Sequence, residues 1–420
     1  MTDLLDDALA ISAAWSHTLD LRGLIERQLE DAGVLGCVVD VVGIGKAARE
    51  MVSALHEVLG SSVQRQLVIV DEGPALSFDA DVEFVIGDHP FPGLGSLMAG
   101  ERLSAFLERS TDAECTVFLV SGGASSLCAL PQSPVDLGDL HELFGAVLTS
   151  GADITTLNQL RAASSRISGG AILRSVRTPR SLSLIMVDNV VSGERWVASG
   201  LTFDFEPTRG DVASLLVAVG ASTQLSEKIL DACDRRDDVM SQPVSTEHLN
   251  RVIAEPSHVL RAVLEEATRR GYRVIDLGSS LRGDVSDVVA LVDRYVTSAG
   301  PGPLCVVGVG EVTLPIRGSG LGGRCQDFAW RMANVLDGKN RSAIALARAT
   351  DGRDFVKGIA GGWTDETTLR RARERGIEWS SVVENNDSFT ALHDLDQLIA
   401  GERTGWNLCD VYLTVVGATL

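Results

Sequence analysis

The sequence predicts an α/β protein of two domains, an N-terminal domain with a doubly wound parallel sheet and a smaller C-terminal α/β domain. Two observations carry this prediction. The chain has 420 residues, more than one hydrophobic core usually holds. Short apolar runs of the kind found in buried parallel strands end repeatedly in glycine turns that open onto helical patterns. We place the boundary near Gln242-Pro243, which gives domains of residues 1–242 and 243–420.

Composition and charge exclude several classes of protein. A formal net charge of −20 argues against non-specific binding to nucleic acid or to an anionic membrane, since both need a basic surface. The N-terminus is acidic and no apolar run reaches about 18 residues, so we expect neither a signal peptide nor a membrane span. The seven cysteines show no metal-ligand spacing, which indicates reduced thiols in the cytoplasm.

The first predicted strand, Cys37 to Val42, ends in a turn that carries Gly43, Gly45 and Lys46 and opens a helix. Such a turn cradles an anion, because bare backbone approaches phosphate and the helix dipole favours negative charge. The turn also fits the fingerprint of Rossmann-like dinucleotide-binding folds. Asp71 is then the acid for the ribose, although it lies beyond the usual spacing of about 20 residues. A solvated Lys46 at a helix start is the structural alternative.

Two further loops follow apolar runs. His89 precedes Pro90 in a proline-rich loop that we expect to be rigid, although a lone loop histidine is more often structural than catalytic. The strand predicted at Val117 to Val120 leads into a glycine-serine turn, which is either a second anion cradle or an ordinary capped turn. The donors of this turn are Ser121, Gly122, Gly123 and Ser125.

Polar residues continue toward the middle of the chain. Asn158 and Arg161 stand before a glycine pair, and the strand predicted at Leu182 to Val187 ends at Asp188. An acid at the carboxyl end of a parallel strand is placed to act as a general base or as a Mg²⁺ ligand. A helix cap is the equally open alternative.

The stretch from Val307 to Met332 organises the C-terminal domain. Its pattern predicts a strand, a turn, a short strand and a glycine loop that opens onto a helix. Arg324, after Gly322 and Gly323, then lies near a helix N-terminus, where free N–H groups attract phosphate or carboxylate. A tight turn with a solvated arginine is the alternative. Around this stretch the pattern predicts helices at His258–Arg270 and Val285–Val296 and strands at Arg273–Leu277, Leu304–Val307, Ala343–Arg348 and Val411–Val416.

Taken in order, these motifs resemble the glycerate 2-kinases of the MOFRL type, which are often labelled as hydroxypyruvate reductases. The resemblance spans nearly the whole chain, with the MOFRL region at about residues 300–418. The matching segments are Gly43–Ala48, His89-Pro90, Ser121–Ser125, Asn158–Gly170, Asp188, Ser199–Thr202, Gly310–Arg324, Thr350–Asp354 and Asn386–Ser388.

The resemblance implies transfer of the ATP γ-phosphoryl group to the 2-hydroxyl of D-glycerate or a related acid, with Mg²⁺, in a cleft between the domains. Lys46 and Arg324 would clamp the transferred group, and Asp188 would orient the hydroxyl or bind the metal. Glu311 and Asp351 are further metal candidates, with turn acids as the alternative. Substrate or phosphate contacts are implied for Gly43, Gly45, His89, Ser121, Gly122, Gly123, Ser125, Asn158, Arg161, Gly322 and Gly323.

Several positions depart from the family pattern, and they permit an altered acceptor, weaker ATP binding or lost activity. They are Ser168, Val191, Ser192, Leu201, Cys325 and Arg403. An NAD(P)H-dependent hydroxypyruvate reductase that uses the Gly43 fingerprint and a non-catalytic binding homologue therefore stay open. The expected partners are a small hydroxy acid and a nucleotide, without nucleic acid or membrane, and a homodimer is left open.

Overall fold

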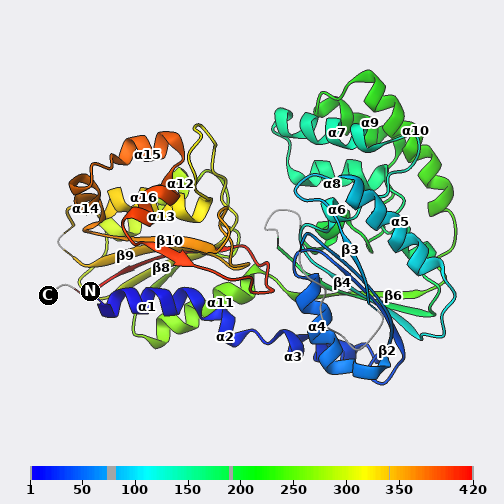
Figure 1. The fold of residues 1–420 in the computed structure, drawn as a ribbon, viewed down its shortest axis with the longest axis horizontal. Helices are drawn as coiled ribbons and strands as arrows, with labels where there is room; N and C mark the ends of the chain where they lie inside the picture. Colours follow the sequence, from blue (N-terminus) through cyan, green and yellow to red (C-terminus); the bar gives the residue numbers. More distant parts are fainter. Residues whose placement is uncertain (1, 73–81, 189–192, 340, 419–420) are drawn as a thin grey trace. The chain divides into compact units, whose positions relative to one another are not determined.

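The computed structural model describes residues 2–72, 82–188, 193–339 and 341–418, and Figure 1 shows their fold. The chain divides into two compact units. The N-terminal unit is Leu21–Ala254, and the C-terminal unit combines Met1–Asp20 with Glu255–Leu420.

The N-terminal unit is built on a sheet in which the described strands all run parallel, in the order β3-β2-β1-β4-β5-β6. This order reverses between β1 and β4, as in doubly wound Rossmann-like sheets, and confirms the predicted architecture. The strands are β1 (Val39–Ile44), β2 (Val63–Val70), β3 (Val82–Ile86), β4 (Cys115–Val120), β5 (Arg180–Met186) and β6 (Glu247–Ala254).

Helices cover this sheet and add a layer of their own. Helix α4 (Ala48–Leu59) packs on β1 and β2 and on α3 (Leu21–Asp31), whereas α5 (Leu94–Glu108) and α6 (Ala124–Leu127) contact β2. A separate apolar core joins α7 (Leu137–Ser150), α8 (Ile154–Ala163), α9 (Arg209–Ala218) and α10 (Thr223–Met240), which Figure 1 shows grouped together. Short 3₁₀ turns lie at η1 (Gly60–Ser62), η2 (Ala171–Ser175) and η3 (Glu194–Ser199).

The C-terminal unit contains a mixed sheet in the order β11-β10-β9-β12-β8-β7. Only β7 and β8 pair in parallel among these described strands, and the other neighbours are antiparallel. The strands are β7 (Arg273–Asp276), β8 (Leu304–Gly310), β9 (Ala343–Ala349), β10 (Ile359–Asp365), β11 (Leu398–Ala400) and β12 (Asp410–Val416).

The helices of the C-terminal unit lie on both faces of its sheet (Figure 1). Helices α1 (Thr2–Ala13) and α11 (Pro256–Arg269) cover one face, and α12 (Val285–Thr297) and α13 (Arg324–Leu336) cover the other. Phe328, Met332 and Leu336 of α13 are fully buried and form the apolar face of this helix. The shorter helices are α2 (Trp15–Thr18), α14 (Thr368–Glu374), α15 (Trp379–Asn385) and α16 (Ser388–Asp394).

The elements predicted from the sequence form within a few residues of their expected bounds, with one exception, whereas β6, β10 and β11 were not predicted. The short strand expected after the turn at Gly310 does not form, and only Thr313 makes a bridge, to Asp284. Pro315 follows closely and has no N–H to donate to a strand ladder, which explains why the pairing stops there.

The two units also differ from the predicted division at 242/243. Strand β6 pairs in parallel with β5, so the first sheet extends to Ala254. Helix α1 contacts β9, β12 and α11, so the first 20 residues pack with the C-terminal unit.

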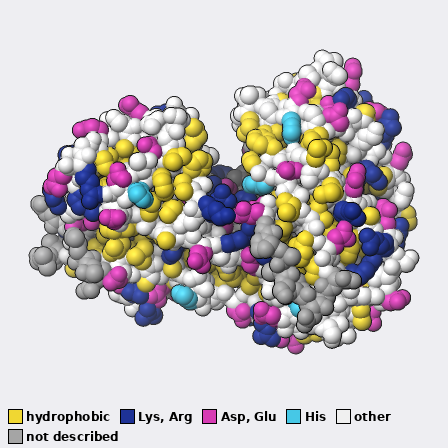
Figure 2. Space-filling view, viewed as in Figure 1, with side chains coloured by type: hydrophobic (Ala, Val, Ile, Leu, Met, Phe, Trp, Pro, Cys, Tyr) yellow, Lys and Arg dark blue, Asp and Glu magenta, His cyan; other side chains and the backbone are white. Residues whose placement is uncertain are grey.

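The acidic side chains on the described surface agree with the negative net charge of the sequence. On the face shown in Figure 2, acidic side chains are scattered over both units among apolar and basic ones. Among the helices of the described residues, none combines the length and the apolar character needed to cross a bilayer.

Candidate active site

The turn after β1 and the turn after β4 are joined by hydrogen bonds at the point where the strand order reverses. The Lys46 amide donates to the Gly122 carbonyl over 3.0 Å, and the Ala47 amide donates to Ser121 Oγ over 3.0 Å. Ligands of doubly wound sheets bind at this switch point, outside the carboxyl ends of the strands. The structure therefore brings together the first two predicted anion cradles.

Gly45 makes this joint possible. Its φ is +126°, a conformation that side chains rarely adopt, and a Cβ there would lie 2.2 Å from Ser121 Oγ. The close approach of the two turns thus requires glycine at this position.

Lys46 and His89 flank the second turn. A Cβ at Gly123 would lie 3.2 Å from Lys46 Cγ and 3.4 Å from His89 Cδ2, so both side chains pass close to this glycine. Burial and the Lys46 charge lower the pKa of His89 to about 4, against a smaller opposing effect of Asp71. His89 is therefore neutral at pH 7, and the positive charge at the switch point comes from Lys46.

A pocket in the same unit contains Arg161, and its empty space including the open mouth is about 320 Å³. Burial lowers the pKa of Arg161 to about 10, so it stays protonated at pH 7. Within the described residues its one recorded contact is the ring of Phe144, whose centroid is 5.8 Å from Cζ. A half-buried cation without a carboxylate destabilises the fold, which points to an anionic ligand. The lining residues include Pro92, Ser125, Leu130, Ser164, Ser165, Ser168 and Ser199.

Two residues implied for the site, Ser125 and Asn158, form a hydrogen-bonded chain at this pocket through Ser199, which belongs to a matching motif but was not predicted as a site residue. Ser125 Oγ lies 2.7 Å from Ser199 Oγ, and Ser199 Oγ donates to Asn158 Oδ1 over 3.0 Å. Ser199 has a φ of +51° and is fully buried. A non-glycine residue in the left-handed region is strained, and such residues gather at functional sites.

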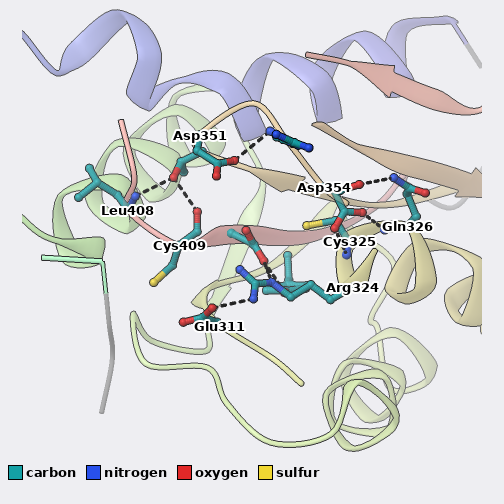
Figure 3. Close-up of polar contacts among 12 residues, drawn as sticks. Glu311, Arg324, Cys325, Gln326, Asp351, Asp354, Leu408 and Cys409 are labelled. Carbon is teal, nitrogen blue, oxygen red and sulfur yellow. Dashed lines mark hydrogen bonds and ion pairs between the residues drawn. The ribbon is translucent and has the colours of Figure 1, made fainter. Parts of the chain in front are cut away.

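Arg324 is the first residue of α13, as predicted, and two carboxylates hold its side chain. Its Nη1 is 2.7 Å from Glu311 Oε1, and its Nε is 2.5 Å from Asp410 Oδ2 (Figure 3). Burial works against the charge of Arg324, but Asp410 and Glu311 outweigh it and raise the pKa of the guanidinium. The side chain is 32% exposed, so part of the guanidinium still faces solvent.

The N-terminus of α13 already carries an anion of its own. The backbone amides of Cys325 and Gln326 donate to the carboxylate of Asp354, the latter over 2.8 Å (Figure 3). Gly323 gives the carboxylate room, since a Cβ there would lie 2.0 Å from Asp354 Oδ1. Burial and the nearby Asp410 raise the pKa of Asp354 to about 7, against the lowering effect of the two amides. The expectation that these free amides attract a ligand is therefore corrected, because a buried aspartate takes two of them.

The glycine loop before α13 is held by the segment Asn385–Asp387. Asn386 Oδ1 accepts from the Arg317 amide over 2.6 Å, and Asp387 Oδ1 accepts from the Leu321 amide over 3.0 Å. The loop thus owes its shape to polar side chains more than sixty residues further along the chain.

The predicted metal ligands do not form one group. Asp188 lies at the carboxyl end of β5 in the N-terminal unit, whereas Glu311 and Asp351 belong to the other unit. Glu311 pairs with Arg324, and Asp351 Oδ1 accepts from the Arg353 amide over 2.9 Å. No group of three or more His, Cys, Asp or Glu placed to hold a metal occurs in the described part of the chain.

Family models match most of the sequence. Residues 16–234, more than half of the chain, match the model described as a domain of unknown function, DUF4147. The chain belongs to the DUF4147 family. Residues 304–410 match the model described as the MOFRL family, inside the region predicted for it.

Curated relatives of this DUF4147 protein extend over nearly its whole length. The D-glycerate 2-kinase of Thermotoga maritima is 28% identical over 394 residues, which are 90% of each chain. The glycerate kinase of Homo sapiens is 26% identical and covers 89% of this chain and 83% of its own length. A putative hydroxypyruvate reductase of Agrobacterium vitis is 29% identical and covers 91% and 99%.

Two solved structures have the same fold. The crystal structure of a glycerate kinase from Thermotoga maritima matches with a TM-score of 0.83 and 25% identity, and it covers 99% of this chain and 100% of that one. A protein from Pyrococcus horikoshii matches with a TM-score of 0.72 and 26% identity over 92% and 89%. These matches confirm the resemblance to the MOFRL-type glycerate 2-kinases.

The departures from the family pattern have varied surroundings. Ser168 is buried and lines the Arg161 pocket, and Leu201 belongs to the apolar core beside the sheet. Cys325 is fully buried in the first turn of α13, and Arg403 lies on the surface before β12. Val191 and Ser192 lie outside the described residues.

Two carboxylates of the C-terminal unit were not predicted as site residues, and each contacts a predicted one. Asp410 pairs with Arg324, and Asp354 binds the amides next to it. The sequence carried a signal for Asp354, because this residue belongs to the matching segment Thr350–Asp354. Asp410 had a weaker one, an acid that directly precedes a buried apolar strand.

Proposed function

We propose that this protein is a kinase that transfers the γ-phosphoryl group of ATP to the 2-hydroxyl of D-glycerate or a related small hydroxy acid. The observation that carries the proposal is the joint of two glycine turns at the carboxyl ends of β1 and β4, with Lys46 beside it. The printed names of the relatives, glycerate 2-kinase and glycerate kinase, support the same activity.

In this reaction the bond between the γ-phosphorus and the oxygen of ADP breaks while a bond from the 2-oxygen of the acid forms. The proton of the hydroxyl group passes to the carboxylate of Asp188, which follows strand β5. Such a transfer needs positioning and charge neutralisation more than covalent help. Lys46 is the group proposed to neutralise phosphate charge at the switch point. His89, neutral at pH 7, offers hydrogen bonding there without a second charge.

The acceptor acid is proposed to bind in the Arg161 pocket. A guanidinium matches a carboxylate through two parallel hydrogen bonds, and this one has no protein carboxylate within the described residues. The pocket joins this guanidinium to several serine side chains, a lining that suits a small polar acid.

We also propose that Arg324 contacts the transferred phosphoryl group and that Asp188 orients the acceptor hydroxyl. Glu311 and Asp410 engage Nη1 and Nε of Arg324, whereas Nη2 makes no hydrogen bond with the described residues. This nitrogen can therefore bind a phosphate oxygen while the ion pairs hold the side chain in place. Mg²⁺ would bind with the phosphates of ATP and neutralise part of their charge, and Asp188, Glu311 and Asp351 remain its proposed ligands.

The proposal is tested by the release of ADP from Mg-ATP in the presence of D-glycerate. Lys46→Ala should lower kcat by about 10²–10³, because a preorganised charge at the transferred group is lost. Lys228→Ala is the matched control, since this lysine pairs with Asp139 on α7 instead. Loss of activity in both variants, or in neither, would contradict the role of Lys46.

A second function has some support. Relatives from Agrobacterium vitis bear the name putative hydroxypyruvate reductase, and the Gly43 turn fits the dinucleotide fingerprint. A reductase should consume NADH or NADPH with hydroxypyruvate, which is followed by absorbance at 340 nm as a general property of these cofactors. An unchanged absorbance would remove this candidate.

We propose a cytoplasmic location as well. Cys37, Cys115, Cys128, Cys233, Cys305 and Cys325 are free thiols, and all of these except Cys37 are buried. Unpaired buried thiols are typical of proteins from a reducing compartment.

A further inference from the structure

The serine hydroxyls that line the Arg161 pocket are mostly committed to protein acceptors. Ser164 Oγ donates to the Leu160 carbonyl over 2.9 Å, and Ser165 Oγ donates to the Leu130 carbonyl over 3.5 Å. Each hydroxyl has a single proton, so these two serines have none left for a ligand. The orientation of the remaining protons then decides which ligands the pocket accepts.

The donor and acceptor roles in the hydrogen-bonded chain from Ser125 to Asn158 follow from the chemistry of its side chains. Asn158 Nδ2 donates to the Trp196 carbonyl, so Oδ1 must face Ser199. An amide oxygen only accepts, and therefore the one proton of Ser199 goes to Asn158. The 2.7 Å contact between the two hydroxyls can then be made only if Ser125 donates to Ser199.

We infer that Ser125 Oγ presents only acceptor lone pairs to the pocket and selects acids that carry a hydroxyl group over acids that carry a keto oxygen at the same carbon. This inference rests on the proposed function in taking the ligand to be a small acid held by Arg161. In the complex without nucleotide, before the proton passes to Asp188 during transfer, Ser125 would accept the hydrogen bond of the 2-hydroxyl of D-glycerate. The keto oxygen of hydroxypyruvate is itself an acceptor, so it would face the lone pairs of Ser125.

The strained backbone at Ser199 supports this assignment. Ala198 and Ser199 both have φ values near the left-handed helix, at 55° and 51°, and Ser199 is fully buried. Only a folded structure that compensates the strain elsewhere keeps two such residues in a row. The strain places Ser199 Oγ between Asn158 and Ser125, where it fixes the direction of the proton.

Ser125 is a specificity group in this scheme and not a general base. Ser125 donates its own proton to Ser199, and the hydrogen-bonded chain ends at the amide oxygen of Asn158, which takes up no proton at neutral pH. To bind a keto acid, Ser125 must turn its proton into the pocket and give up one internal hydrogen bond. Such a bond contributes about 1 kcal/mol, which corresponds to about five- to tenfold in affinity.

The test compares binding of D-glycerate and hydroxypyruvate to the full-length protein by calorimetry, without nucleotide. The wild type should bind D-glycerate about five- to tenfold more tightly. Ser199→Ala frees the proton of Ser125, so the ratio of the two affinities should fall toward one. The variant keeps the backbone feasible, because Ala198 already adopts the same conformation.

Ser125→Ala provides a second route to the same readout, because Ser125 lies on the short helix α6 and its replacement leaves the strained residues Ala198 and Ser199 unchanged. It should also bring the ratio toward one, through weaker binding of D-glycerate. Thr202→Val is the matched control, because Ser183, Thr202 and Asn250 form a similar chain of two hydroxyls and an amide outside the pocket. This control should leave the ratio unchanged.

A wild-type ratio near one, or a ratio that survives both Ser199→Ala and Ser125→Ala, would overturn the inference. A fall in the Thr202→Val control equal to that in Ser199→Ala would overturn it too, since the effect would then be a general loss of buried hydrogen bonds. The release of ADP is measured separately. If ADP is released but the two acids bind with equal affinity, only this inference is refuted. If D-glycerate binds more tightly as expected but no ADP is released, only the proposed kinase activity is refuted.

Discussion

At Arg161, binding and stability are expected to oppose each other. Burial lowers the pKa of its guanidinium, and within the described residues no carboxylate compensates the charge. A charge in this position costs the fold free energy that a bound carboxylate would return. Replacing a residue that serves a ligand in this way by an apolar residue usually stabilises the protein.

We therefore predict that Arg161→Met raises KM for D-glycerate by about 10–100-fold, because a charge-assisted hydrogen bond is lost. The same variant should raise the midpoint of thermal unfolding by about 2–4 °C, the effect of roughly 1 kcal/mol. Steady-state kinetics and calorimetry check the two effects. Arg166→Met, at an exposed neighbouring arginine, is the control. A less stable variant with unchanged KM would show Arg161 to be a structural residue.

At the scale of one element, α13 depends on an aspartate that lies outside it. Asp354 accepts from the amides of Cys325 and Gln326, and Gln326 Nε2 donates back to the Asp354 carbonyl over 2.8 Å. These bonds satisfy orphan amides of the helix and complement its dipole. Because α13 begins at Arg324, the cap also positions that side chain.

The cap should give α13 a pH-dependent stability. In the fold the pKa of Asp354 is raised to about 7 from its ordinary value of 3.8. Between about pH 4 and 7 the unfolded chain has released this proton and the folded chain has not, so stability falls as pH rises. Hydrogen exchange should show the opening free energy of α13 decreasing over this range by up to about 3 kcal/mol relative to Asp354→Asn.

Asp276→Asn is the control for this effect, because Asp276 is an exposed turn acid of the same unit that accepts from the Gly278 amide. This variant should show the same dependence of the opening free energy of α13 on pH as the wild type. A slope that persists in Asp354→Asn would show that another group of the unit carries the proton.

At the scale of the whole molecule, the chain begins in one unit, crosses to the other and returns. Helix α1 packs on β9, β12 and α11 of the C-terminal unit. Asp7 of α1 pairs with Arg270 and accepts from Tyr272 Oη over 2.8 Å. Burial, followed by the contact with Asp7, raises the pKa of Tyr272. The N-terminal segment is thus a structural part of the unit that holds Arg324.

Asp7→Ala should destabilise the C-terminal unit by about 1–2 kcal/mol, since two partners lose a charged acceptor. Hydrogen exchange should become faster in α11, β9 and β12 and stay unchanged in β1, β4 and β5. Asp6→Ala, at the exposed neighbouring residue, is the control and should change neither set. Faster exchange in β1 and β4 would contradict the assignment of α1 to the C-terminal unit.

The strand, turn and helix units were predictable because their signals are local. Apolar runs end at Gly43 and at Ser121, and glycine and helical patterns follow directly, so the doubly wound sheet and its cradles could be inferred. The contact between the two turns at Gly45, the Arg161 pocket and the donor roles of its hydroxyl groups could not be inferred, since they depend on residues from separate elements.

The sequence by itself therefore determined the two-domain α/β architecture, the positions of Lys46 and Arg324 and the resemblance to glycerate 2-kinases. Only the tertiary structure decided what surrounds Arg324, that Asp354 caps its helix, and that Ser199 links Asn158 to Ser125. The physical reason is the range of the interactions. Backbone preferences act over a few residues, whereas hydrogen bonds and ion pairs join residues that are dozens of positions apart and become neighbours only when the sheets form.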